Sequence, residues 1–168
     1  ELEKAFAGIG GEGGGADVTT RLFGTFLTWL QEKDSLAFVV ATANDIAKMP
    51  PELLRKGRFD EIFYVGLPNE TERHTIFTIH IRKRRPQDLN KIDIDTLVGL
   101  TDGYSGADIE GVIKDSIEEV FSQGRNELTT EDIKQAINNT HSLSEIMKDS
   151  MDKMEKLYQE RKFKNASE

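Results

Sequence analysis

The sequence contains no cysteine, so it can form neither a disulfide nor a metal site with thiolate ligands. No apolar run approaches the length that spans a bilayer, and the first residues do not resemble a signal peptide, so we expect no membrane association. Acidic residues outnumber basic ones by 30 to 22, and the net charge of −8 argues against broad electrostatic binding to nucleic acid. A phosphate-binding loop with Gly-Lys-Ser or Gly-Lys-Thr is also absent from these residues.

Length and composition fit a globular protein. The 168 residues suffice for one domain or two small ones, and 37% hydrophobic with 31% charged residues is typical of a soluble protein with a modest core. Because the chain starts without Met, we expect it to be a piece of a longer protein. The absence of cysteine fits a cytoplasmic origin.

The most informative stretch covers residues 38–61, FVVATANDIAKMPPELLRKGRFDE. Its first residues, Phe38 to Ala41, lack polar alternation, which predicts a strand buried on both faces, as in parallel sheets. Asn44 follows at the carboxyl end of this strand, where open α/β sheets usually bind ligands. Arg55 and Arg58 flank a glycine further on, and guanidinium groups suit phosphate and the charge that develops in phosphoryl transfer.

This stretch resembles AAA+ ATPases of the subgroup that contains the membrane protease FtsH, the segregase and katanin. The resemblance implies that Asn44 is the sensor-1 asparagine, which orients water and the γ-phosphate. It also implies that Arg55 and Arg58 are paired arginine fingers, which reach the nucleotide of a neighbouring subunit. Taken singly, the asparagine also fits a capped turn, and the arginines fit surface ion pairs with Asp60 and Glu61.

The first residues, Glu1 to Glu3, resemble the Walker B motif of the same family from its glutamate onward. Glu1 would then polarise the attacking water, although Glu3 offers a second register and a terminal glutamate also fits simple solvation. The glycine-rich residues 8–15 favour a flexible loop, which the family would place as a second pore loop.

Residues 19–33 predict an amphipathic helix. Its expected core stripe consists of Leu22, Phe23, Phe26, Leu27 and Leu30, with Trp29 on the edge. Arg21 fits either a subunit-interface arginine or a solvated one. The pattern of EKAFAG, a glycine loop and RLFGTFLTWLQEK is similar to the AAA+ group encoded in plastid and cyanobacterial genomes, which implies a plastid stroma location if the gene is plastid-encoded.

Residues 61–65 predict a second buried strand, and Asn69 with Glu72 predicts a capping box that starts a helix. His80 on this helix matches a family histidine beside the ribose and adenine of the nucleotide. By itself it also fits a boundary residue with satisfied hydrogen bonds. The basic run 82–85 fits a solvated helix C-terminus better than a nucleic-acid patch.

The run 103–108, GYSGAD, resembles the sensor-2 region of the family. Ser105 and Asp108 predict a second capping box, followed by a helix. Its expected buried residues are Ile109, Val112, Ile113, Ile117, Val120 and Phe121. The resemblance implies that Gly106 and Ala107 let the helix start approach the adenine ring, whereas the alternative for Gly106 is a tight helix start without a ligand.

The last part of the chain predicts two more helical segments. Thr129 caps a helix that runs through Asn139, with Ile133 and Ile137 facing inward. The tail then carries a stripe of Leu143, Met147, Met151, Met154 and Tyr158. Such a stripe packs on its own domain or receives a partner, and the sequence leaves both readings open.

We therefore expect an α/β plus α fold. The C-terminal part of a P-loop NTPase parallel-sheet subdomain would cover residues 1–68, the AAA+ helical lid 69–141, and a helical tail 142–168. The strands that flank residues 36–43 in the family precede Glu1, so we expect open strand edges here.

The resemblance implies ATP and Mg²⁺ as cofactors, a homo-oligomeric ring, hexameric in the family, and a macromolecular substrate such as a protein. The expected function is the C-terminal portion of an ATP-hydrolysing module that couples nucleotide turnover to remodelling, inactive as an isolated piece. The alternative is a non-catalytic assembly or partner-binding module with relic motifs. We identify no metal ligand.

Overall fold

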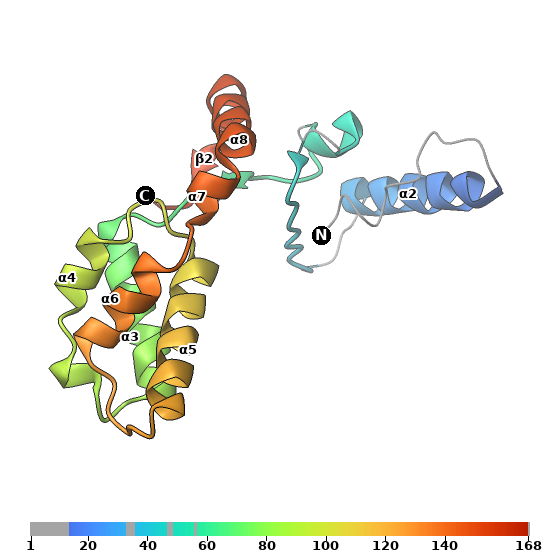
Figure 1. Cartoon of the computed structure of the whole chain (residues 1–168). Coiled ribbons are helices and arrows are strands. Elements are labelled where there is room, and N and C mark those ends of the chain that lie inside the picture. Colours follow the sequence, from blue (N-terminus) through green and yellow to red (C-terminus); the bar gives the residue numbers. More distant parts are fainter. Residues whose placement is uncertain (1–13, 33–35, 47–48, 56, 168) are drawn as a thin grey trace. The chain divides into compact units, whose positions relative to one another are not determined.

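The computed structural model describes residues 14–32, 36–46, 49–55 and 57–167 (Figure 1). The chain divides into two compact units, unit 1 over Glu1–Ile62 and unit 2 over Phe63–Glu168, and each is described by itself. In these ranges no helix is both long and apolar enough to cross a bilayer.

Unit 1 contains helix α2 (Gly14–Glu32), which confirms the predicted amphipathic helix and begins earlier than expected. Phe23 and Leu30 are buried, while Phe26 and Leu27 pack against the same cluster. Leu22, expected in the core, is 62% exposed, because the stripe that is buried passes through its neighbour Phe23.

The strand predicted at 38–41 is not formed, since residues 36–43 adopt neither helix nor strand. Phe38 is 91% exposed, and Leu36 and Val40 are exposed as well. A strand exists only through ladder hydrogen bonds to a neighbouring strand. In the described part of the chain, the sheet consists of two strands that both lie in unit 2, so it offers residues 36–43 no pairing.

A short 3₁₀ helix, η2 (Pro51–Leu54), follows in unit 1. Pro51 opens it, as expected for a residue whose missing N–H has no helical acceptor. Leu53 points inward and is fully buried in the cluster with Met49, Phe23 and Leu30. This anchor fixes the position of the loop that carries Arg55 and Arg58.

Unit 2 is a helical bundle with one core (Figure 1). Its helices are α3 (Glu70–Arg84), η3 (Leu89–Lys91), α4 (Ile94–Gly99), α5 (Gly106–Ser122) and α6 (Thr130–Asn138). Helix α3 packs on α4 and α5, and α5 packs on α6. The fully buried apolar residues include Phe77, Ile81, Leu97, Ile109, Val112, Ile113, Leu128 and Ile133.

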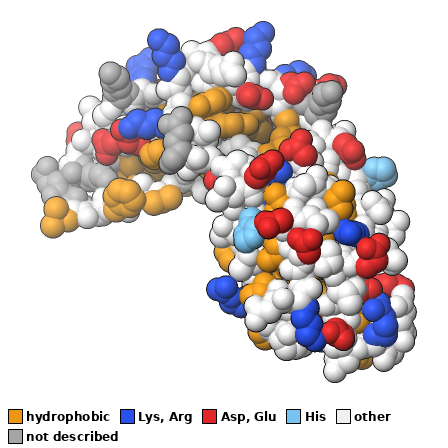
Figure 2. Space-filling model, turned by 90° about the vertical axis from the view of Figure 1, so that its left-hand side faces the viewer, with side chains coloured by type: hydrophobic (Ala, Val, Ile, Leu, Met, Phe, Trp, Pro, Cys, Tyr) orange, Lys and Arg blue, Asp and Glu red, His pale blue; other side chains and the backbone are white. Residues whose placement is uncertain are grey.

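The outer surface of the bundle carries charges of both signs. Figure 2 shows acidic and basic side chains mixed over its visible face rather than gathered by sign. Ion pairs form along single helices of this unit, Lys114 with Glu118 on α5 and Lys134 with Glu131 on α6.

The helix starts predicted at Asn69, Ser105 and Thr129 are confirmed. Each of them forms a capping box, with Glu72, Asp108 and Asp132 respectively, and Ser142 with Glu145 makes the same reciprocal pair of hydrogen bonds further along the chain. Each cap satisfies backbone N–H groups that the first helical turn leaves without acceptors, and contributes about 1 kcal/mol. One core expectation in α5 is wrong: Phe121 is 82% exposed, because Val120 takes the inward position in the last turn.

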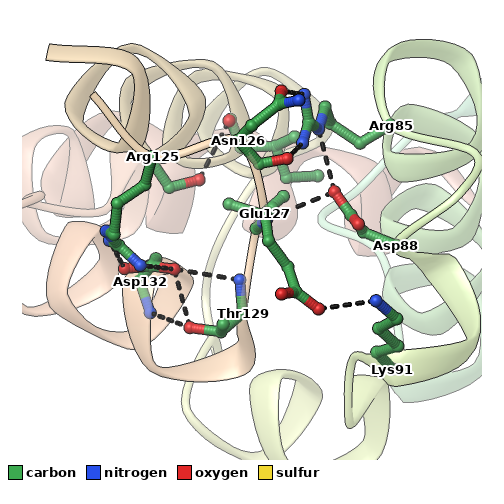
Figure 3. Close-up of polar contacts among 11 residues, drawn as sticks. Arg85, Asp88, Lys91, Arg125, Asn126, Glu127, Thr129 and Asp132 are labelled. Atoms are coloured by element: carbon green, nitrogen blue, oxygen red, sulfur yellow. Dashed lines mark hydrogen bonds and ion pairs between the residues drawn. The ribbon is translucent and has the colours of Figure 1, made fainter. Parts of the chain in front are cut away.

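A polar clasp ties the end of α3 to the loop before α6 (Figure 3). Its centre is Asp88, only 2% exposed, which accepts hydrogen bonds from Arg85 Nε at 2.9 Å and from the backbone N–H of Leu128 at 3.2 Å. Arg85 also donates to the backbone carbonyl of Asn126. Two ion pairs flank the clasp, Lys91 with Glu127 and Arg125 with Asp132. The end of the basic run 82–85 is therefore a tertiary contact, not only a solvated helix end.

The tail returns to the start of unit 2. After α7 (Leu143–Ile146) and α8 (Lys148–Arg161), strand β2 (Lys164–Asn165) pairs in parallel with β1 (Phe63–Tyr64). The Tyr64 and Tyr158 rings stack with centroids 4.6 Å apart. The strand predicted at 61–65 is thus confirmed only at Phe63 and Tyr64, and its partner comes from the tail. Its predicted burial is wrong, because Phe63 is 55% and Val65 78% exposed beside a sheet of only two short strands in the described residues. Met147 and Met154 in the predicted stripe are 46% and 38% exposed.

Candidate functional site

A hollow of about 420 Å³ lies in unit 2 at the N-terminal ends of α3 and α5. Its walls come from residues 65–68, from the first turns of α3 as far as Ile76, from Gly106 and from Ser167. The volume falls within the range of sites that bind small molecules. Segments that are distant in the sequence therefore meet around one concave surface.

Gly106 opens α5 in the wall of this hollow. A Cβ atom at this position would lie 3.8 Å from Ile76 Cδ1, so the glycine leaves the space of a side chain open between the two helices. The capping box holds this helix start in place, because Asp108 Oδ2 accepts from Ser105 N at 2.7 Å and from Ser105 Oγ at 2.8 Å. Ala107 follows, is exposed, and is not among the residues that line the hollow.

His80 lies one helical turn after the wall residue Ile76 on α3, with 20% of its side chain exposed, and is not among the residues that line the hollow. Its Nδ1 is 3.0 Å from Arg84 Nη1 and 3.7 Å from Glu110 Oε1. Arg84 also forms an ion pair with Glu110, which lies one turn after Gly106 on α5. The hydrogen bond from Arg84 holds the pKa of the Glu110 carboxyl below its ordinary value of 4.5.

Asn44, Arg55 and Arg58 belong to unit 1, and Glu1 lies outside the described residues. Asn44 is exposed at a bend. Arg55 is exposed directly after η2, where its backbone N–H donates to Glu52 O at 3.3 Å. Arg58 is partly buried, and its guanidinium donates to the same carbonyl across a turn. The two arginines therefore differ, one facing outward and one held by its own loop.

The turn between the two arginines depends on Gly57. Its φ angle is +90°, in a region that residues with a Cβ atom rarely adopt. The glycine thereby allows the chain to reverse directly after η2, so that Arg58 folds back on Glu52.

No three side chains of the metal-binding kind lie close enough together to hold an ion, as far as the chain is described.

Some residues of the site were not identified from the sequence. Val65 and Ser167 line the hollow together, but no sequence pattern indicates that the tail returns to β1. Arg84 and Glu110 could have been found, because each lies four residues after a candidate on its own helix, His80 and Gly106 respectively.

Two family models match the chain. Residues 1–67 match the "ATPase family associated with various cellular activities (AAA)", and residues 91–135 match the "AAA+ lid domain". Together these matches cover parts of both structural units.

Individual proteins that are similar to the chain also include AAA domain-containing proteins. The AAA domain-containing protein ycf46 of Pyropia yezoensis is 46% identical over 167 residues, which cover 99% of this chain and 34% of that protein. Its counterpart in Guillardia theta is 43% identical over 155 residues, covering 92% of this chain and 30% of that protein. The proteasome-activating nucleotidase of Saccharolobus solfataricus is 36% identical over 118 residues, or 70% of this chain and 30% of that protein. The chain thus spans about a third of the length of these relatives.

Proposed function

The chain belongs to the AAA ATPase family, and from this premise we propose that it is the C-terminal portion of a module that binds and hydrolyses ATP and couples nucleotide turnover to remodelling of a macromolecule. The observation that carries the proposal is the hollow between α3 and α5, with Gly106 in its wall. Bound ATP with Mg²⁺ supplies the phosphoanhydride bond that is hydrolysed.

The residues of unit 2 hold the nucleoside end in this proposal. Ile76 gives the base an apolar surface, and Gly106 keeps the helix start from filling the space. His80 contacts the nucleoside from the next turn of α3, and Ala107 continues the helix start beside the adenine ring. The walls are wide enough for a base and a ribose.

The residues of unit 1, with Glu1, act on the phosphate end. Glu1 polarises the attacking water, and Asn44 orients this water and the γ-phosphate. Arg55 and Arg58 act on the nucleotide of the neighbouring subunit, which requires a head-to-tail ring because such a contact is heterologous and must close. Arg58 has to leave its contact with Glu52 to do so, whereas Arg55 is already exposed.

The wider biology follows from the same premise. Relatives named proteasome-activating nucleotidase support a protein as the remodelled macromolecule. We place the parent protein in the cytoplasm, or in the plastid stroma if its gene is plastid-encoded. The 168 residues alone should not hydrolyse ATP, since they contain no Gly-Lys-Ser or Gly-Lys-Thr loop for the phosphates.

The decisive experiment fills the hollow in the full-length protein. Gly106→Leu should weaken ATP binding by about tenfold or more, because the new side chain projects toward Ile76 into the space for the base. Gly111→Leu is the matched control, since it lies on the same helix and a Cβ atom there meets no neighbour within 4 Å. Equal ATP affinity in both variants and the wild type, measured by calorimetry, would refute a nucleotide site in this hollow.

A second experiment tests the arginines in the parent ring. Arg58→Ala should lower kcat on the order of 10³-fold, as for other arginine fingers that act in trans, while ATP affinity changes little. Mixing this variant with one that lacks the phosphate-loop lysine should restore part of the activity. Arg82→Ala, an exposed arginine on α3, serves as the control. Failure of the mixture to recover activity would argue for a structural role of Arg58.

A further inference from the structure

The two side chains beside His80, those of Arg84 and Glu110, determine which of its ring nitrogens carries the proton. A guanidinium group has only hydrogen-bond donors. At 3.0 Å from Arg84 Nη1, the Nδ1 atom of His80 must therefore accept, so it carries no hydrogen. The proton of the neutral imidazole then lies on Nε2.

The carboxylate of Glu110 does not compete for this nitrogen. Its Oε1 is 3.7 Å from His80 Nδ1, which is too long for a hydrogen bond, and it already pairs with Arg84 Nη2. Glu110 thus holds the guanidinium in place from α5, while Arg84 directs its other nitrogen at the imidazole from α3. The spacing of four residues between His80 and Arg84 places both on one face of the helix.

We propose that the Arg84–Glu110 ion pair fixes His80 as the tautomer with hydrogen on Nε2, and thereby makes Nε2 the donor to an acceptor atom of a bound nucleoside. Arg84 is then a positioning residue, which acts on the ligand through His80. The identity of the ligand rests on the proposed function, whereas the tautomer rests on the geometry of unit 2 alone.

Nitrogen NMR of the imidazole rings tests the tautomer directly. The ¹⁵N-labelled chain is measured at about pH 8, where a histidine of ordinary pKa is neutral. The spectrum contains three histidines, and His80→Gln identifies the signals of His80. Nδ1 should resonate as an unprotonated nitrogen and Nε2 as a protonated one. A protonated Nδ1 in the wild-type chain would overturn the proposal.

Arg84→Met tests whether the ion pair is the cause. We expect the two tautomers of His80 to mix, with both nitrogen signals moving toward intermediate positions, while backbone amide spectra stay native. Arg82→Met is the matched control, because it removes an exposed arginine from the same part of α3. An unchanged His80 spectrum in Arg84→Met, or an equal change in Arg82→Met, would overturn the proposal.

Nucleotide binding by the full-length protein tests the consequence. Arg84→Met should weaken ADP binding by about two- to tenfold, the effect of one impaired hydrogen bond. This loss should disappear in the His80→Ala background, because Arg84 acts through the imidazole. A loss that persists undiminished would overturn the role of His80 as intermediary. If the wild-type protein bound no nucleotide, the proposed function would fail, and the nitrogen spectrum would still decide the tautomer.

Discussion

The two units differ in how much of their apolar surface they bury. Unit 2 encloses a continuous core contributed by α3, α4, α5 and α6. The core of unit 1, in its described residues, is a small cluster around Leu53. Phe38 is exposed, although the next residue, Val39, packs against this cluster. Since burial of apolar area is the main favourable term in folding, the units should differ in stability.

The contrast follows from the kinds of element that each unit contains. A helix satisfies its backbone hydrogen bonds within one segment, and a bundle of short, capped helices needs only neighbours in sequence. A strand needs a partner, and parallel partners are distant in the chain. Residues 36–43 have the composition of a buried strand, but the described sheet gives them no pairing. Apolar composition alone therefore does not produce a core.

The largest expected effect concerns amide hydrogen exchange. Amides of 109–120 in α5 should exchange on the order of 10³-fold more slowly than those of 36–43, because exchange in the core helix requires opening of the bundle. Mass spectrometry of peptides from the exchanging chain measures both segments in one sample. Similar protection of the two segments would contradict the difference between the units.

The second prediction concerns how much the bundle core stabilises unit 2. Phe77→Ala should lower the free energy of unfolding of unit 2 by about 3–5 kcal/mol, since Phe77 is fully buried and its loss leaves a cavity. Phe121→Ala is the matched control, because this phenylalanine of the same unit is exposed, and its change should stay within about 0.5 kcal/mol. Urea titration followed by circular dichroism gives both values. Equal losses would mean that the core is elsewhere.

The third prediction concerns the clasp at the end of α3. Asp88→Ala should lower the free energy of unfolding of unit 2 by about 1–3 kcal/mol, because it leaves the N–H of Leu128 and Nε of Arg85 without their acceptor. Glu118→Ala removes an exposed carboxylate from α5 and should have little effect. A loss in the Asp88 variant no greater than in the Glu118 variant, by the same titration, would show that the clasp does not stabilise the bundle.

The smallest effect is a pH dependence. Burial raises the pKa of Asp132, but hydrogen bonds from Arg125 and Thr129 outweigh it and bring the pKa below its ordinary value of 3.8. A carboxyl whose pKa is lowered in the folded state stabilises that state above its unfolded pKa, and this contribution is lost as the pH falls through the folded pKa.

Asp132→Asn should therefore lower the stability of unit 2 at pH 7 by at most about 1 kcal/mol, the scale of a solvent-screened pair. The difference from the wild type should shrink as the pH falls below about 4, where this carboxyl becomes protonated in the unfolded chain, and should vanish once the pH is below its lowered pKa in the folded state. Melting temperatures of both proteins between pH 7 and pH 2.5 provide the test. A gap that widens in acid would contradict the lowered pKa.

The sequence was most informative where local chemistry decides the structure. The caps at Asn69, Ser105 and Thr129 follow from side chains that bond to backbone groups three residues away, so a single sequence contains the whole interaction. A strand at 38–41 would depend on partner strands elsewhere in the chain, and the prediction of this strand was wrong. The predicted burial of Phe121 was also wrong, because helical periodicity does not show where the neighbouring helices end.

In the candidate site, too, the features set by local interactions could be predicted, and those that depend on distant segments could not. The helix start at Gly106 could be predicted, and it lies in the wall of the hollow. The contribution of Ser167 could not be predicted, because it depends on the pairing of β2 with β1. Arg84 was read as part of a charged helix end, although its spacing from His80 was visible in the sequence.

The parallel pair of β1 and β2 has a consequence for the order of folding. Phe63 and Lys164 stand opposite each other although nearly all of unit 2 lies between them in the chain, so the bundle itself is the crossover. Closing so long a loop is costly in entropy, and a pair of two-residue strands returns little energy until the helices have brought its ends together. We expect this pair to form last and to open first. Ser167 then joins and leaves the wall of the hollow with it, so the shape of the hollow is completed by the final step of folding.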